Sequence, residues 1–216
     1  MEEINLFWFK KDLRVFDNLA LTQALRKGKV LPFFLIEPEL WKLPDHSARQ
    51  WEFVRECLID LNSSLNQIGL QLIIRVGNIK EVVIEFMQHY QIGSIYSHQE
   101  TGNKWTFKRD TDLRIFTKKF NIEWHEFKQS GVIRGLKTRK GWAQKWEQHV
   151  SQELISIPSK VNYSIDIKSQ ELPSSSSLNL KKDKCTLRIR GGRTNAICRL
   201  NKFINYKIEN YQYSLS

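Results

Sequence analysis

The stretch Ile4-Asn5-Leu6-Phe7-Trp8-Phe9 is a short and nearly continuous apolar run close to the N-terminus. A parallel strand that is covered on both faces needs such a run, whereas a half-exposed strand would alternate apolar and polar residues. A helix is expected next, because Asp17 and Asn18 offer a cap and Gly28 offers a stop. A second apolar run, Val30–Ile36, follows. The order strand, helix, strand predicts a right-handed crossover between parallel strands.

The same alternation continues to residue 127. Ser47 is expected to cap a long helix that ends at Gly69, because apolar residues recur there at three- and four-residue spacing. The further expected elements are strands at 70–76, 94–97 and 122–127 and helices at 79–90 and 101–119. The fold class is therefore α/β, a doubly wound five-stranded parallel sheet with helices on both faces. Ligands bind such sheets beyond the carboxyl ends of the strands, so a site is expected within 10–14, 37–49 and 98–105.

The composition suits a globular protein. The chain has 216 residues, of which 41% are hydrophobic and 26% charged, and this excludes collagen-like, wholly disordered and disulfide-scaffold classes. No run approaches the roughly 18 apolar residues of a membrane span. The opening Met1-Glu2-Glu3 is acidic, so we expect a cytoplasmic protein with no membrane partner. The cysteines and histidines lack metal-ligand spacing, so we expect reduced cysteines and no metal site.

The formal net charge of +11 is unevenly distributed. Residues 1–101 carry a net charge of −2, residues 102–150 carry +7 and residues 151–216 carry +6. A one-sided basic excess attracts polyanions through phosphate contacts and counterion release, which makes nucleic acid a candidate partner. A solvated lysine-rich surface explains the same charge equally well.

The pattern changes after residue 150. Residues 156–184 contain Pro158, Pro173 and four consecutive serines, and we expect a polar linker with little to bury. Gly191-Gly192-Arg193 then opens a segment with apolar residues at helical spacing. The expected organisation is an α/β domain at 1–150, a linker at 151–185 and the start of an incomplete helical domain at 186–216. The apolar stripe of that single helix predicts self-association through 191–211, or docking back on the sheet domain.

Conventional nucleotide and hydrolase motifs are absent, because the chain has no GxGxxG, GxxxxGK[ST], HExxH or GxSxG string. Three unusual strings lie instead at the expected edge of the sheet. They are Trp8-Phe9-Lys10-Lys11-Asp12-Leu13-Arg14 followed by Asp17-Asn18, Ile36-Glu37-Pro38-Glu39-Leu40-Trp41 followed by Ser47-Ala48-Arg49-Gln50-Trp51, and His98-Gln99-Glu100-Thr101-Gly102-Asn103-Lys104-Trp105 followed by Arg109-Asp110.

Together these strings resemble bacterial members of the photolyase/cryptochrome family. The string Gly131-Val132-Ile133-Arg134 with Gly141-Trp142-Ala143, and the helix opening at Gly191, extend the resemblance to nearly the whole chain. The resemblance implies an N-terminal α/β domain that holds a light-harvesting antenna chromophore, joined by a linker to a helical domain that binds FAD. In the photolyases, light-excited reduced flavin splits pyrimidine dimers in DNA. Cryptochrome relatives use the flavin for signalling.

The cofactor-binding residues expected at the sheet edge are Lys10, Asp12, Arg14, Glu37, Arg49, Gln99, Glu100 and Thr101. The resemblance implies antenna contacts for Glu37, Arg49 and Glu100 among them, and it places Tyr211 at the rim of the FAD pocket. Asp12 could hold the neighbouring cations through charge-assisted hydrogen bonds, although a purely structural salt-bridge turn accounts for the same string. Arg49 lies in the first turn of a helix, against the preference of the helix dipole, and either contacts an acidic ligand or is solvated. The Asn-Glu pair associated with folate antennas is absent, which favours a flavin or deazaflavin antenna, or none, over folate.

The expected contacts with DNA are weak. The candidate residues are Arg134, Lys137, Arg139, Lys140 and Lys145, which are interleaved with Trp142 and Trp146. The tryptophans of the chain are expected to pack in the core. FAD retention and catalysis need the helical domain, so this chain alone is expected to be inactive. The alternatives are a cryptochrome-type blue-light receptor domain and a non-catalytic nucleotide-binding module on the same fold.

Overall fold

The computed structural model describes residues 1–181, 184, 185 and 187–214. The sheet consists of β1 (Glu3–Phe9), β2 (Val30–Ile36), β3 (Ile73–Val76), β4 (Gln91–His98) and β5 (Glu123–Phe127). All neighbouring strands are parallel, and their order is β3-β2-β1-β4-β5. The predicted five-stranded doubly wound sheet is confirmed. The chain winds outward first through β2 and β3 and then through β4 and β5, so the order reverses between β1 and β4.

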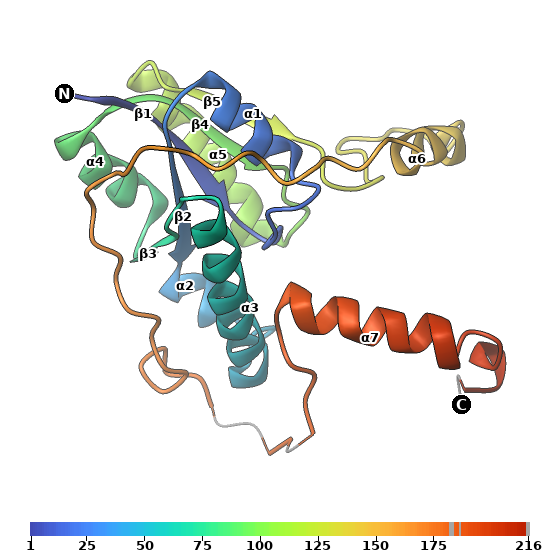
Figure 1. Cartoon of the computed structure of the whole chain (residues 1–216). Helices are drawn as coiled ribbons and strands as arrows, with labels where there is room; N and C mark the ends of the chain where they lie inside the picture. The colour runs from blue at the N-terminus through green and yellow to red at the C-terminus, as the bar shows by residue number, and fades with distance from the viewer. Residues whose placement is uncertain (182–183, 186, 215–216) are drawn as a thin grey trace.

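Helices cover both faces of the sheet (Figure 1). The helices are α1 (Leu19–Lys27), α2 (Pro38–Trp41), α3 (Ala48–Gln67), α4 (Ile79–His89), α5 (Lys104–Lys119), α6 (Trp142–Val150) and α7 (Arg193–Tyr206). One core lies under α1 and α3 and includes Phe7 and Phe9, whereas the other lies under α4 and α5 and includes Leu6 and Trp8. Alternate residues of β1 therefore pack in the two cores, which explains why the run from Ile4 to Phe9 is apolar apart from Asn5.

Local chemistry sets the boundaries of the helices. The side chains of Asn18 and Ser47 accept hydrogen bonds from Leu21 N and Gln50 N, as the expected caps of α1 and α3. Asn103 caps α5, so this helix begins at Lys104 and not at the expected Thr101. Strand β3 begins at Ile73, three residues after the expected start at Leu70.

The described residues between 151 and 185 form no helix or strand, and the expectation that 156–184 has little to bury was wrong. That this segment links two domains stays a prediction. Val161, Tyr163, Leu172 and Leu180 pack against the core beneath α1 and α3, and Leu178 is only 6% exposed within it. The segment also hydrogen-bonds to the open edge of β3, where Gln170 N–H donates to the Ile74 carbonyl at 3.1 Å. Lys182 and Asp183, which the sequence assigned to the linker, and Thr186, at its expected boundary, lie outside the described residues.

Two helices project away from the sheet (Figure 1). Residues 128–150 form an arm that ends in helix α6, and no residue of this helix is buried. Helix α7 occupies most of the expected segment 191–211, and the apolar side chains of Ile197, Leu200 and Ile204 are between 37% and 49% exposed. Self-association through this face stays a prediction.

Candidate functional site

A cavity of about 1060 Å³ opens at the carboxyl ends of β1 and β2, next to the place where the strand order reverses. Its floor is formed by the residues that end these strands, and one side by α2 and the first turns of α3. Leu187, Ile189 and Ala196 also line the cavity. Doubly wound sheets bind ligands at this place, because the diverging loops leave a crevice between them.

The cavity is lined by aromatic side chains and by an excess of cationic side chains. Trp8, Phe34, Trp41 and Phe53 supply aromatic side chains. Seven cationic side chains and two carboxylates line the cavity in the described part of the chain: Lys10, Lys11, Arg14, Arg49, Arg109, Arg188 and Arg193 with Glu37 and Glu100. Such a surface suits a planar heterocycle that carries a negatively charged group.

Arg109 of α5 connects the loops that follow β2 and β4. Its guanidinium donates to Glu37 at 2.6 Å, to Glu100, and to Asp110 Oδ1 at 3.0 and 2.8 Å. The guanidinium also lies 4.7 Å from the centre of the Trp8 ring. The neighbouring carboxylates raise the pKa of Arg109 despite its burial. Burial raises the pKa of Glu37 to about 7, even though Arg109 opposes the shift.

Lys10 lies between two indole rings. Its ammonium group is 4.5 Å from the centre of the Trp8 ring and 4.9 Å from that of Trp124. It donates to Asp110 at 3.1 Å, and Glu126 is 3.9 Å away. Burial lowers the pKa of Lys10, while the carboxylates nearby counteract this shift. The group is thus fixed in place by aromatic and acidic neighbours.

The expectation that Asp12 holds the neighbouring cations was wrong. The Asp12 carboxylate is fully buried and bonds instead to the His98 ring at 2.6 Å and to the Lys10 backbone N–H at 3.0 Å. Arg14 donates to the Asp17 carbonyl at 2.8 Å. Asp12 and His98 thereby fasten the loop after β1 to the end of β4, and they support the site from beneath.

The structure brings together five of the nine residues expected to contact a cofactor. Lys10, Arg14, Glu37, Arg49 and Glu100 line the cavity. The other four are not among its described lining residues: Asp12, Gln99, Thr101 and Tyr211. Thr101 is exposed, and Tyr211 lies beyond α7, where its ring meets Phe203 edge to face. Assignment of these residues to a cofactor stays a prediction.

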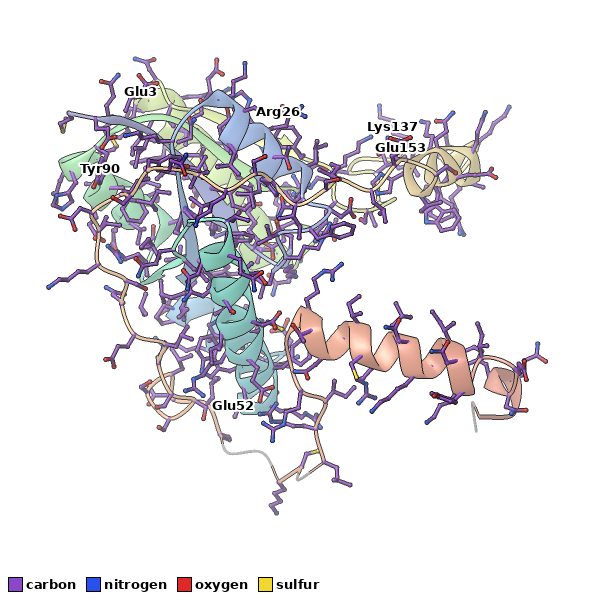
Figure 2. The ribbon with its side chains drawn as sticks, viewed as in Figure 1. Glu3, Arg26, Glu52, Tyr90, Lys137 and Glu153 are labelled. Carbon is purple, nitrogen blue, oxygen red and sulfur yellow. The ribbon has the colours of Figure 1, made fainter. Side chains whose placement is uncertain are left out.

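The residues expected to contact DNA divide into two groups. Arg134 donates to Glu126 at 3.1 Å and to the Glu100 carbonyl, so its charge belongs to the network beside the cavity. The other four are exposed on the arm that carries α6: Lys137, Arg139, Lys140 and Lys145. Figure 2 shows Lys137 on this arm. DNA binding by these residues stays a prediction.

The tryptophans follow the core expectation only in part. Trp8, Trp41 and Trp51 are buried, as predicted. Trp146 is 45% exposed, so the expectation was wrong there. Trp146 packs on Gly131 instead, where an added Cβ would meet its ring at 2.3 Å.

Arg109 and Asp110 are the main site residues that the sequence reasoning did not assign. Both belong to the third unusual string, but the helix that carries them follows its strand by several residues. The sequence did contain a signal for these two site residues. They form an Arg-Asp pair about one and a half turns into a helix that begins at the edge of the sheet. Among the described residues, no group of three or more His, Cys, Asp or Glu side chains could hold a metal ion. No helix in the described ranges has the length and apolar character needed to cross a membrane.

The match to a known family extends over most of the sheet domain and the arm. The family model described as DNA photolyase matches residues 5–152. The chain belongs to the DNA photolyase family. Among curated members, it is 23% identical over 92% of its length to cryptochrome DASH of Gloeobacter violaceus, and 33% identical over 45% of its length to the chloroplastic/mitochondrial cryptochrome DASH of Solanum lycopersicum.

Solved structures of photolyases and cryptochromes share the fold. The cryptochrome of Synechocystis sp. PCC6803 matches with a TM-score of 0.78, at 18% identity over 98% of this chain. An archaeal photolyase from Sulfolobus tokodaii, solved with two FAD molecules, matches with a TM-score of 0.70 at 22% identity over 93% of this chain. The chain spans 48% and 46% of the lengths of these two structures, and 44% and 18% of the two curated cryptochromes.

Proposed function

We propose that this photolyase-family chain binds a light-harvesting antenna chromophore in the cavity at the carboxyl ends of β1 and β2. The single observation that carries the proposal is the position and lining of that cavity in a chain of this family. Aromatic side chains such as Trp41 and Phe53 would stack on a heterocycle, and the arginines at the rim would hold an anionic tail. We favour a flavin or deazaflavin over a folate.

The Sulfolobus tokodaii photolyase supports a flavin, because its structure contains two FAD molecules with the implication of a novel light-harvesting cofactor. We propose that excitation energy passes from the antenna to FAD in a helical domain, of which residues 186–216 would form the beginning. Repair of pyrimidine dimers in DNA and blue-light signalling are both open to a protein of this organisation. That this chain alone does not retain FAD, that it contacts DNA weakly and that it is cytoplasmic stay predictions.

The test begins with the absorption spectrum of the freshly purified chain in the near-UV and visible range, beside that of the supernatant after heat denaturation. A released pigment would identify the chromophore class. A colourless sample is then titrated with FMN, FAD, 8-hydroxy-5-deazaflavin, methenyltetrahydrofolate and AMP. Binding of AMP alone would favour a nucleotide-binding module, and binding of none would contradict the proposal.

A pair of matched variants locates the bound ligand. Gln50→Trp adds a bulky side chain to an exposed residue of α3 that lines the cavity, whereas Gln67→Trp adds the same side chain at the other end of α3. We expect Gln50→Trp to weaken binding about tenfold or more, because the new ring occupies the cavity, and Gln67→Trp to bind like the wild type. Equal binding by both variants would place the ligand elsewhere.

A further inference from the structure

The start of α7 is capped by side chains of another helix. Gly192 at the N-cap position has no side chain of its own, so the first amide groups of α7 need other acceptors. Three residues of α3 supply them. Gly191 N–H donates to Glu56 at 2.7 Å, Gly192 N–H to Cys57 Sγ at 3.1 Å and Arg193 N–H to Asp60 at 3.0 Å.

Charged contacts reinforce this capping. Arg188 donates to both oxygens of Glu56, at 2.7 and 2.9 Å, and Arg190 adds a third bond at 3.1 Å. Thr194 Oγ1 donates to Asp60 at 2.6 Å. These bonds hold the pKa of Glu56 at about 2, with the Arg188 pair as the largest cause. The carboxylate is therefore charged at all physiological pH values, and a bidentate guanidinium pair fixes geometry as well as charge.

The backbone approaches α3 so closely that only glycine fits. A Cβ on Gly191 would lie 2.1 Å from the Phe53 carbonyl oxygen and 3.0 Å from the Glu56 side chain. Gly192 has a φ of +100°, a backbone conformation that residues other than glycine rarely adopt. The pair Gly191-Gly192 therefore allows the close contact between α3 and α7. This structural role accounts for a double glycine that is not part of a phosphate-binding loop.

The same segment forms one side of the cavity. Leu187, Arg188, Ile189, Gly192, Arg193 and Ala196 line it. Two of the seven cations at the cavity, Arg188 and Arg193, belong to this segment. We call residues 187–196 the strap. If the strap separated from α3, the side of the cavity that it forms would be open to solvent.

We infer that Glu56 and Asp60 are positioning residues that hold the strap on α3 as a wall of the cavity, so that strap docking and ligand binding strengthen one another. The second half of the inference rests on the proposed function. Any ligand that contacts both the sheet edge and the docked strap must favour the docked state, because its affinity differs between the two states.

Hydrogen exchange measured by mass spectrometry tests the docking itself, without a ligand. In Glu56→Gln the charge that holds Arg188 and Arg190 is lost, and we expect peptides covering 187–196 to exchange at least about tenfold faster. Peptides from β1 and β4 should be unchanged. Gly191→Ala separates the strap by steric contact and should give the same pattern, and Glu81→Gln, which removes a charge from exposed Glu81 on α4, should behave as the wild type. Unchanged strap exchange in both test variants, or faster exchange throughout the domain, would overturn the inference.

Titration with FMN tests the coupling. Glu56→Gln should bind FMN about tenfold more weakly than the wild type and Glu81→Gln, and FMN should slow strap exchange in the wild type. Wild-type affinity in a Glu56→Gln protein whose strap exchanges fast would contradict the coupling. Failure of FMN and the other chromophores to bind the wild type would contradict the proposed function and the coupling, whereas the exchange result would still decide whether Glu56 holds the strap on α3.

Discussion

Asp12 Oδ2 lies 2.6 Å from His98 Nδ1, and both side chains are almost completely buried. This bond joins the loop after β1 to the last residue of β4, across the point where the strand order reverses. Burial opposes the ionisation of Asp12, but the hydrogen bond and charge of His98 together with the backbone N–H bonds hold the pKa of Asp12 below its ordinary value. The pair therefore fixes the geometry of the loop that carries Lys10, Lys11 and Arg14.

Asp12→Ala should lower the free energy of unfolding by about 3 kcal/mol or more, because it leaves the His98 ring buried without its acceptor. Since the folded-state pKa of Asp12 is lowered, its contribution is present above its ordinary pKa and is lost as the pH falls through the folded value. The difference between wild type and variant in urea unfolding should thus shrink on strong acidification. Asp112→Ala, at a half-buried residue on the surface of α5 that pairs with exposed Lys108, is the control and should unfold like the wild type. Equal stability of the two variants would show that the Asp12–His98 pair does not hold the loop.

Glu37 should make the stability of the chain fall as the pH rises. Its pKa is about 7 in the folded protein and near the ordinary 4.5 in the unfolded chain, so the folded state binds more protons between these values. The free energy of unfolding then decreases from about pH 4.5 to pH 7 and levels off above that. Glu37→Gln removes this slope, and the measurement is the difference between wild type and variant in urea unfolding across the range. A difference that does not change with pH would mean that Arg109 keeps Glu37 ionised throughout.

The irregular segment after residue 150 should contribute to the stability of the sheet domain. Leu178→Ala should reduce the free energy of unfolding by about 2 to 4 kcal/mol, because Leu178 is 6% exposed within the core beneath α1 and α3. Leu154→Ala lies in the same irregular segment at a residue that is 68% exposed and should change stability by less than about 0.5 kcal/mol. Chemical denaturation of both variants distinguishes a packed segment from a passive tether, for which the two effects would be equal.

The basic arm should account for any affinity of this chain for DNA. Substituting Lys137, Arg139, Lys140 and Lys145 by Gln should weaken binding to a labelled duplex and reduce the slope of log K against log salt by about 0.9 for each phosphate that the arm no longer neutralises. The control removes the same charge from α5, by substituting Lys104, Lys108, Lys118 and Lys119 by Gln. Fluorescence anisotropy at several salt concentrations gives both slopes. An equally weakened affinity in the two variants would mean that net charge, and not the arm, attracts DNA.

Much of the fold could be predicted, because its signals are local. The apolar run of β2 and the caps Asn18 and Ser47 depend on neighbouring residues alone, and the predicted elements are found there. The irregular segment was misjudged because its composition is polar on average. Its apolar residues alternate at 161, 163, 165 and 167, a period that indicates an extended segment with one buried face. Val161 and Tyr163 pack on the core beneath α1 and α3, and Ile165 and Ile167 pack on the core beneath α4 and α5.

The site could be predicted mainly where residues directly follow strands. Lys10 and Glu37 come after β1 and β2, so the parallel topology alone brings them to one edge. The hydrogen bond from Arg109 to Glu37 joins residues 72 positions apart in the sequence. It depends on how α5 packs on the sheet, which a local pattern does not predict. The packing of the strap on α3 depends on an approach between backbones that composition and periodicity do not encode.

The hydrogen bonds between the irregular segment and β3 have a consequence for solubility. β3 is an outermost strand, and Ile74 N–H and Val76 N–H would be open to pairing with another molecule if Ser169 Oγ and Gln170 Oε1 did not accept from them at 2.9 and 2.8 Å. Exposed strand edges of this kind are templates for the growth of intermolecular sheets. Residues 168–170 therefore cover the edge of β3 and disfavour aggregation. A sheet domain that ended before these residues would expose this edge even if every other contact in its two cores were kept.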